Sequence, residues 1–287
     1  MKYDRCATTI EEQVDILEDR GLIIEDRSFA IAALKKIGYF RFKGYCLPFY
    51  KSKDKFWENV TFFSIYQNYR FDERFRLLLF QIIEHVEVEL KSIIARDFAL
   101  ETSPLGFYDP HNFDRLDFHE SWLEKFKQLT SQSSKRRELY TDHYIKNYDN
   151  IFPVWVAMEM SDFGSLSKFF YNINRPLRNK ISKKNYGYSS FYISNWIYVL
   201  SVTRNICAHN GRIYDRIFPI QAQLSKKDSD ILNNRAFVAI YICHKICLDT
   251  EYFGMFKANL TNLIGIYKDY IDIDKIGFPE NWEEYLS

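Results

Sequence analysis

Apolar residues recur every three or four positions along most of the chain, which is the pattern of amphipathic helices. The longest such run lies between residues 49 and 103, a stretch without glycine or proline. Ten apolar residues keep the helical spacing within it: Phe71, Phe75, Leu78, Leu79, Ile82, Ile83, Val86, Leu90, Ile93 and Ile94. We therefore predict one long helix from about residue 64 to residue 100.

Four polar residues on this helix, Glu84, His85, Glu87 and Glu89, could suggest a metal site. Glu87 and Glu89 would point about 200° apart, however, so they do not converge on one ion. We predict that these residues form the solvated face of the helix.

The remaining elements are also predicted to be helical. Thr8 or Thr9 can cap a first helix with Glu11 and Glu12 in its opening turn, Gly21 ends it, and a second helix spans about 26 to 37. Residues 38 to 50 should form an aromatic loop or a short extended segment. Later helices are expected at 119–146, 153–173, 190–210, 228–249 and 252–271, with 130 to 138 as the most plausible flexible insertion.

The scarcity of chain-breaking residues supports an all-α fold. Seven prolines and ten glycines punctuate the chain, which favours long helices and allows at most a minor strand pair near 38 to 50. We expect a single domain over 1–287. In it, a helical and aromatic part at 1–60 packs on the main bundle at 61–287.

Composition narrows the class of protein. The 287 residues are 47% hydrophobic and 27% charged, as in ordinary globular proteins. A net charge of +1 gives no global field, so nucleic acid would be bound only through local patches. No secretory signal, membrane-spanning run or cysteine framework is evident, and we expect a cytoplasmic protein with reduced thiols.

Cys243, His244 and Cys247 lie close together and could hold zinc. A zinc site needs a fourth ligand and usually a second close pair of ligands, which the sequence does not offer. We interpret these cysteines as core thiols on a helix and expect neither metal nor cofactor.

Three polar residues interrupt the apolar helix at 190–210. Arg204 follows Ile193 by eleven residues, almost three turns, so it falls on the apolar stripe of that helix. An unpaired buried guanidinium is costly, so Arg204 must face a partner, a cleft or a phosphate. Asn205 and His209 lie four residues apart on a neighbouring face. Gly211 suits a left-handed helix end, and His209 would occupy the last turn, where the helix dipole favours positive charge.

Arginine, asparagine and histidine gathered at a helix end are the parts needed to cleave RNA without metal. Histidine can take the proton of a 2′-hydroxyl or protonate the leaving 5′-oxygen, and arginine can stabilise the charge that builds on the phosphate. The expected products are a 2′,3′-cyclic phosphate and a 5′-hydroxyl. Because this chemistry needs both an acid and a base, two motifs facing each other in a symmetric dimer would supply the pair. The structural alternative is that Arg204 pairs with a core carboxylate such as Glu159.

The residues around this motif resemble a known family. "RNICAHNGRIYDR" is similar to the R-N-x-x-A-H-N-x-R signature of the Abi-like abortive-infection proteins, which belong to the HEPN superfamily with its R-x(4–6)-H motif. "YRFDERFRLLLFQIIEHVEVELKSIIA" resembles the long central helix of the family. "FPVWVAMEMSDFGSLSKFF" and "GFPENWEEYL" resemble later segments. All the signature positions match: Arg204, Asn205, Ala208, His209, Asn210 and Arg212.

This resemblance implies an α-helical HEPN domain that acts as a dimeric, metal-independent endoribonuclease in phage defence or a toxin–antitoxin system. Arg204 and His209 would be the catalytic pair, Asn205 would orient His209 or contact phosphate, and Arg212 would be a weaker RNA contact. RNA is the implied substrate, and a small non-coding RNA or a protein antitoxin is a further implied partner. The alternative is a HEPN module that binds RNA or a partner without catalysis.

Two basic segments could extend an RNA path. "RPLRNKISKK" at 175–184 contains no acid. It is either a solvated loop or a weak RNA-binding patch formed by Arg175, Arg178, Lys180, Lys183 and Lys184. Segment 35–43 alternates basic and aromatic residues, which either stack on bases or pack the N-terminal helices onto the bundle.

Overall fold

The computed structural model describes residues 6–131 and 139–287, and these confirm the all-α prediction. The helices and strands are α1 (Ile10–Asp19), α2 (Arg27–Ile37), α3 (Tyr39–Cys46), β1 (Tyr50–Ser52), β2 (Lys55–Phe56), α4 (Phe62–Glu101), α5 (Leu116–Ser131), α6 (Leu139–Asn147), α7 (Val154–Met160), α8 (Phe163–Asn172), α9 (Arg175–Tyr186), α10 (Ser190–Ala208), α11 (Ala236–Ile246), α12 (Thr250–Tyr267) and α13 (Trp282–Tyr285). β1 and β2 form one antiparallel hairpin. Short 3₁₀ turns occur at 47–49, 106–108, 110–112, 226–228 and 273–276.

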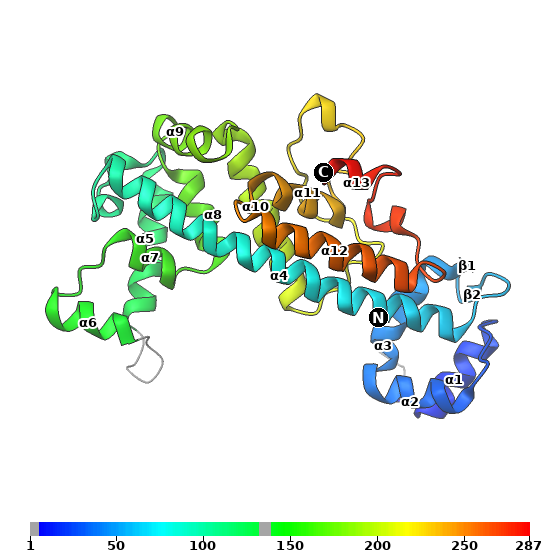
Figure 1. Ribbon diagram of the computed structural model, residues 1–287. Coiled ribbons are helices and arrows are strands. Elements are labelled where there is room, and N and C mark those ends of the chain that lie inside the picture. The colour runs from blue at the N-terminus through cyan, green and yellow to red at the C-terminus, as the bar shows by residue number, and fades with distance from the viewer. Residues whose placement is uncertain (1–5, 132–138) are drawn as a thin grey trace.

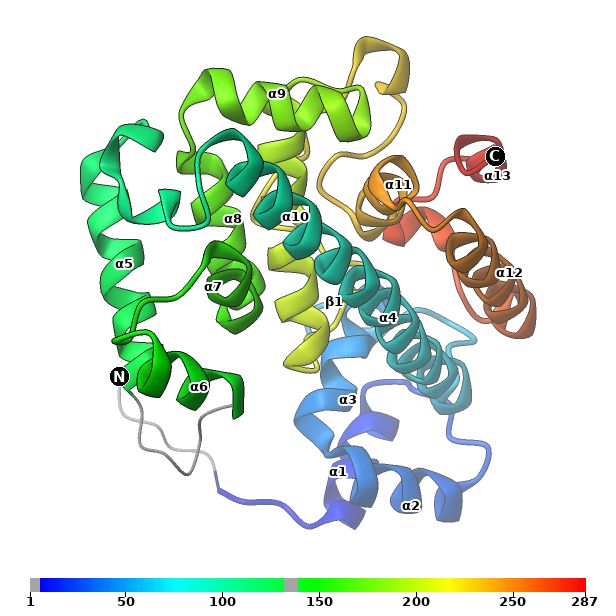
Figure 2. The ribbon, with the colours of Figure 1, turned by 60° about the vertical axis from the view of Figure 1, so that its left-hand side comes forward.

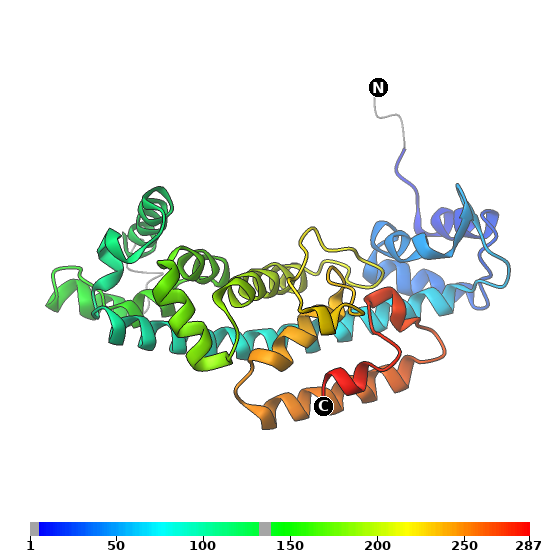
Figure 3. The same cartoon turned by 90° about the horizontal axis from the view of Figure 1, so that it is seen from above.

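The long helix α4 organises the molecule, and the prediction of a helix over about 64 to 100 is confirmed. It runs the length of the molecule, with α1–α3 near one end and α5–α9 near the other (Figure 1). Helices α10 and α12 pack on opposite sides of its middle, as the view from above shows (Figure 3). The helices packed around α4 therefore leave only a narrow strip of α4 exposed to solvent.

This enclosure contradicts the prediction that Glu84, His85, Glu87 and Glu89 form a solvated face. Only Glu84 is fully exposed, whereas Glu87 is 5% exposed. The two carboxylate oxygens of Glu89 accept the backbone N–H groups of Leu248 and Asp249, each at 3.0 Å. Helical spacing predicted the directions of these side chains, but the sequence did not reveal that α10 and α12 cover two opposite sides of α4.

The N-terminal region folds into three short helices. Thr9 and Glu12 form a capping box at the start of α1, and Asp26 caps α2. The predicted loop at 38 to 50 is wrong over most of its length, because residues 39–46 form α3 and the hairpin begins only at Tyr50. Gly38 adopts φ 78°, which allows one helix to follow the other directly. Phe42 then stacks on Phe62 of α4 with 4.4 Å between ring centroids.

Several later helices begin or end elsewhere than predicted. The region 119–146 contains α5 and α6, and most of the predicted insertion, residues 132–138, lies outside the described residues. The region 153–173 is divided into α7 and α8 because Asp162 caps α8 by accepting the N–H of Ser165. The helix predicted at 228–249 begins only at Ala236.

The basic segment 175–184 is helical, which rules out the solvated-loop interpretation. Asn174 caps α9, Pro176 lies in its first turn, and Gly187 ends it with φ 73°. Lys180 pairs with Glu101 at 2.5 Å and Lys184 pairs with Asp97 at 3.0 Å, so both side chains connect α9 to α4.

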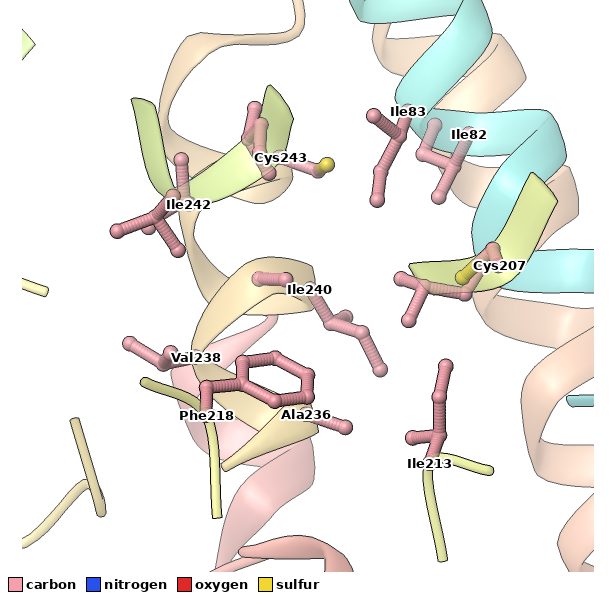
Figure 4. Close-up of a cluster of buried hydrophobic side chains, with 14 of the residues drawn as sticks. Ile82, Ile83, Cys207, Ile213, Phe218, Ala236, Val238, Ile240, Ile242 and Cys243 are labelled. Carbon is pink, nitrogen blue, oxygen red and sulfur yellow. The ribbon is translucent and has the colours of Figure 1, made fainter. Parts of the chain in front are cut away.

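The core beneath the end of α10 fixes the rotation of that helix. Cys207 points from the last turn of α10 into a buried cluster (Figure 4). Ile82 from α4, Ile213 from the following loop and Ile240 from α11 belong to the same cluster. With Cys207 buried, the neighbouring Asn205 and His209 are directed towards solvent.

Candidate functional site

The helix α10 ends in a Schellman motif directly after the candidate residues. The N–H of Gly211 donates to the carbonyl of Ile206 at 2.8 Å, and the N–H of Asn210 donates to the carbonyl of Cys207 at 3.1 Å. Asn210 adopts the left-handed conformation with φ 55°, so the prediction that Gly211 takes this role is wrong. Gly211 is needed for another reason: a Cβ atom there would lie 2.9 Å from Cγ2 of Ile206.

The chain that follows the motif is anchored to α4 by a buried carboxylate. Asp72 is fully buried and accepts the N–H groups of Ile213 at 3.1 Å and Tyr214 at 2.8 Å. It also accepts the hydroxyl of Tyr45 and pairs with Arg76, each at 2.5 Å. This network fixes the loop after His209 relative to α4. The only signal for it in the sequence was a pair of charges four residues apart in the apolar stripe.

Arg204 lies between α10 and α4. Its Nε is 3.5 Å from Oε2 of Glu87, and its guanidinium carbon is 5.6 Å from the ring centroid of Phe80. Glu159, the core carboxylate named in the structural alternative, is exposed and does not pair with Arg204 among the described residues. The carboxylate that pairs with Arg204 therefore comes from α4.

The pairing with Glu87 leaves Arg204 partly free. Glu87 also pairs with Lys91 at 3.2 Å, and neither Nε of Arg204 nor Oε2 of Glu87 has a hydrogen-bond partner within the described chain. The Arg204 side chain remains 30% exposed, and its Nη1 is 3.5 Å from the amide oxygen of Asn205. Glu87 faces Nε of the guanidinium, while the partly exposed remainder of the side chain presents N–H donors of the kind that bind oxyanions.

Asn205 and His209 are exposed at the end of the same helix. The backbone N–H of His209 donates to the carbonyl of Asn205 at 3.0 Å, but no hydrogen bond joins their side chains within the described residues. Both side chains are therefore accessible from solvent.

Three further arginines surround this helix end. Arg41 of α3 donates to the carbonyl of Asn210 at 2.9 Å, and Arg216 donates to the carbonyl of Arg212 at 3.3 Å. Arg212 keeps a buried Nη1 without a hydrogen-bond partner in the described part of the chain. With Arg204, these side chains concentrate positive charge at one end of α10, in a protein whose net charge is only +1.

The five basic residues of α9 do not share one face. Arg175, Arg178 and Lys183 line an open groove between α9 and its neighbours, whereas Lys180 and Lys184 pair with acids of α4.

The described residues contain one group of side chains with metal-ligand chemistry. Ligand atoms of His85, Glu89 and Cys247 lie within 4.8 Å of one another. Each oxygen of Glu89 already accepts a backbone N–H, and burial raises the pKa of the Cys247 thiol to about 12. The Cys247 thiol is therefore neutral, and the Glu89 carboxylate beside it caps the turn between α11 and α12. Cys243 is fully buried nearby.

Comparison with protein-family models finds a match to the Abi-like proteins over residues 32–215, which covers more than half of the chain and includes the whole 204–212 motif. The chain therefore belongs to the Abi-like protein family. This membership suggests a defence protein of the abortive-infection type. No curated protein and no solved structure matches the chain. None of the described helices has the length and apolar character needed to span a bilayer.

Proposed function

We propose that this protein is a metal-independent endoribonuclease of HEPN type that acts in abortive infection or as a toxin. The observation that carries the proposal is the placement of Arg204, Asn205 and His209 on one accessible helix end, with Glu87 orienting the arginine.

In the proposed reaction, a 2′-hydroxyl attacks the adjacent phosphorus and the 5′-oxygen leaves. His209 takes the proton from the nucleophile or returns one to the leaving group. The free edge of Arg204 binds a phosphate oxygen and stabilises the charge that develops on it. Asn205 contacts the phosphate or positions His209, and Arg212 adds positive charge beside the strand.

A homodimer would supply the second histidine. Two large apolar side chains close to the motif lack cover and support this arrangement. Phe40, next to the Arg41 that holds the Asn210 carbonyl, is 91% exposed, and Leu77, one turn before Phe80, is 67% exposed. Burying such side chains against a second copy is favourable by about 1.5–3 kcal/mol each. The interface would then place two motifs around one phosphate.

The test is cleavage of an RNA panel in EDTA by the wild type, Arg204→Ala and His209→Ala. Each variant should lose about 10²-fold or more in rate while folding normally. His111→Ala is the matched control, because that side chain is 91% exposed and lies far from the motif in the chain. Full activity in His209→Ala, or loss of wild-type activity in EDTA, would contradict the proposal.

Mixing inactive chains tests the dimer in the same assay. If one site draws Arg204 from one copy and His209 from the other, excess Arg204→Ala added to His209→Ala should restore some activity. If all four groups are required, either variant should inhibit wild type through heterodimers. A Phe40→Glu chain that is monomeric and fully active would contradict the two-motif site.

The ion pair between Arg204 and Glu87 also favours a second candidate, a module that binds RNA or a partner without cleaving. A structural role for Arg204 predicts that Arg204→Ala unfolds more easily than wild type. The non-catalytic module also predicts that neither the wild type nor Arg204→Ala cleaves any RNA of the panel.

A further inference from the structure

Helices α5, α8 and α9 and the first half of α10 come together at one end of the molecule (Figure 2). Their side chains line an open groove. Its volume is about 1260 Å³, larger than the roughly 300–1,000 Å³ of ordinary small-molecule pockets. Arg175, Arg178 and Lys183 of its lining belong to the basic segment 175–184, but the groove itself forms only because α5 packs near the consecutive helices α8, α9 and α10.

The groove is lined by cations and by no acid. Five basic side chains contribute to it: Lys125, Lys168, Arg175, Arg178 and Lys183. Among the described residues, Lys168, Arg175 and Lys183 have no side-chain ion pair. Such a local concentration of positive charge attracts a polyanion although the chain as a whole is nearly neutral.

Two polar groups in the groove lack the hydrogen bonds that burial demands. Ser194 of α10 is 7% exposed, and its Oγ has no partner in the described chain. Nε of Arg178 is also buried without a hydrogen bond, although its guanidinium lies 3.5 Å from Asp114. Buried polar atoms are normally hydrogen-bonded, so these two mark a groove wall whose polar groups are incompletely paired within the described chain.

Exposed aromatic rings line the groove together with these charges, and guanidinium groups of Arg115 and Arg178 lie over Phe118 and Tyr171. Phe118, Tyr171, Phe191 and Tyr198 all line the groove and are all exposed to solvent. Rings of this kind form platforms on which unpaired bases stack, and adjacent cations bind the intervening phosphates. Neither feature alone identifies a ligand, but together they match an unpaired polynucleotide strand.

The groove lining on α10 ends at Tyr198, and an exposed stripe of the same helix leads from there to the candidate active site. Phe191, Tyr198 and Asn205 are spaced by seven residues, so they form one exposed stripe with a drift of only about 20° per step. Tyr198 precedes Asn205 by about 10 Å along the helix axis. A strand held in the groove can therefore extend directly to Arg204 and His209.

We propose that this groove binds single-stranded RNA and directs it along α10 to the motif. This inference rests on the proposed ribonuclease function and adds a substrate class, since stacking on these rings requires bases that are not paired in a duplex. A strand of several nucleotides accounts for the size of the groove and for the exposed stripe that leads to Asn205.

The test measures binding separately from cleavage. A labelled single-stranded RNA 12-mer is titrated with His209→Ala protein, and Tyr198→Ala or Lys183→Ala is added to that background. Tyr198→Ala should weaken binding about 5- to 100-fold. Lys183→Ala should also weaken it and should lower the slope of log affinity against log salt by about 0.7.

Two matched controls keep the outcome decisive. Tyr148 is 53% exposed against 52% for Tyr198 and lies outside the groove, and Lys127 is exposed two residues from the groove-lining Lys125. Tyr148→Ala and Lys127→Ala should bind the 12-mer as the His209→Ala protein does. Unchanged affinity in both groove variants would overturn the proposal. So would equal affinity for a duplex of the same length, or competition by a mononucleotide at the same concentration as the 12-mer.

Cleavage kinetics in the His209-containing protein separate this inference from the proposed function. Tyr198→Ala should raise KM and leave kcat nearly unchanged, as expected for loss of uniform binding. If the wild type cleaves no RNA but the binding differences persist, the proposal of an RNA-binding groove is supported and the catalytic proposal fails. If cleavage depends on His209 but not on the groove variants, the groove proposal fails alone.

Discussion

Replacing Asp72 by asparagine should destabilise the protein strongly, because the carboxylate is a buried junction. Asp72 is fully buried and accepts bonds from Tyr45, Ile213 and Tyr214 in addition to the ion pair with Arg76. Asparagine keeps the shape but removes the charge, which leaves the buried guanidinium of Arg76 unpaired. Breaking such a pair costs about 3–5 kcal/mol of unfolding free energy.

The corresponding shift in melting temperature follows from the chain length. An unfolding entropy of about 2.1 cal/mol/K per residue gives about 0.6 kcal/mol/K for 287 residues. Asp72→Asn should therefore melt about 5–8 °C below the wild type. Calorimetry or thermal circular dichroism at pH 7 measures this shift.

Glu73→Gln is the matched control, because it makes the same chemical change at the next residue of α4. Glu73 pairs with Arg70 at 2.7 Å, but both side chains are about one-third exposed. The loss of unfolding free energy should stay below about 1 kcal/mol, which corresponds to about 2 °C in melting temperature. If Asp72→Asn melts within 2 °C of Glu73→Gln, the buried junction does not contribute as argued.

Two further predictions concern the helix ends and pH. Gly211→Ala should lose about 1–3 kcal/mol of unfolding free energy, because its Cβ atom would lie 2.9 Å from Ile206. Asn210→Gly should be neutral or slightly stabilising, because Asn210 adopts the left-handed conformation. Equal melting temperatures for Gly211→Ala and wild type would contradict the first expectation. Burial, reinforced by two nearby lysines, lowers the pKa of His244 to about 4. The unfolded chain then binds the proton more tightly, so stability is complete above about pH 6.5 and falls as the pH approaches 4. After discounting for partial exposure the loss is about 1–2 kcal/mol. Urea titrations at pH 7.5 and 4.5 should show it in wild type and not in His244→Gln, and parallel losses would refute the assignment.

The elements that the sequence predicted well are those with long apolar patterns. Helix α4 was predictable because apolar side chains repeat over most of its 40 residues. Helix α9 was missed because only Ile181 and Ser182 are buried on it, too few to give a periodic signal. Its flanking signals, a capping Asn174 and a terminating Gly187, were present and could have identified it.

The candidate site was also predictable only in part. Helical spacing alone brought Arg204, Asn205 and His209 to one helix end. The partner of Arg204 was not predicted, because the sequence interpretation placed Glu87 on a solvated face, and only the packing shows that this side of α4 faces α10. The basic segment 175–184 pointed to part of the groove lining, but the groove itself depends on how α5 packs near α8, α9 and α10.

The attacking 2′-hydroxyl provides the most direct test of the central claim, that Arg204 and His209 cleave RNA by internal attack. An RNA that the wild type cleaves at one position is compared in EDTA with the same RNA carrying a single 2′-deoxynucleotide immediately 5′ of the scissile phosphate. The account predicts that cleavage at that position disappears, and that the all-RNA products carry a 2′,3′-cyclic phosphate and a 5′-hydroxyl. Continued cleavage of the 2′-deoxy substrate there, or products with a 5′-phosphate, would contradict it.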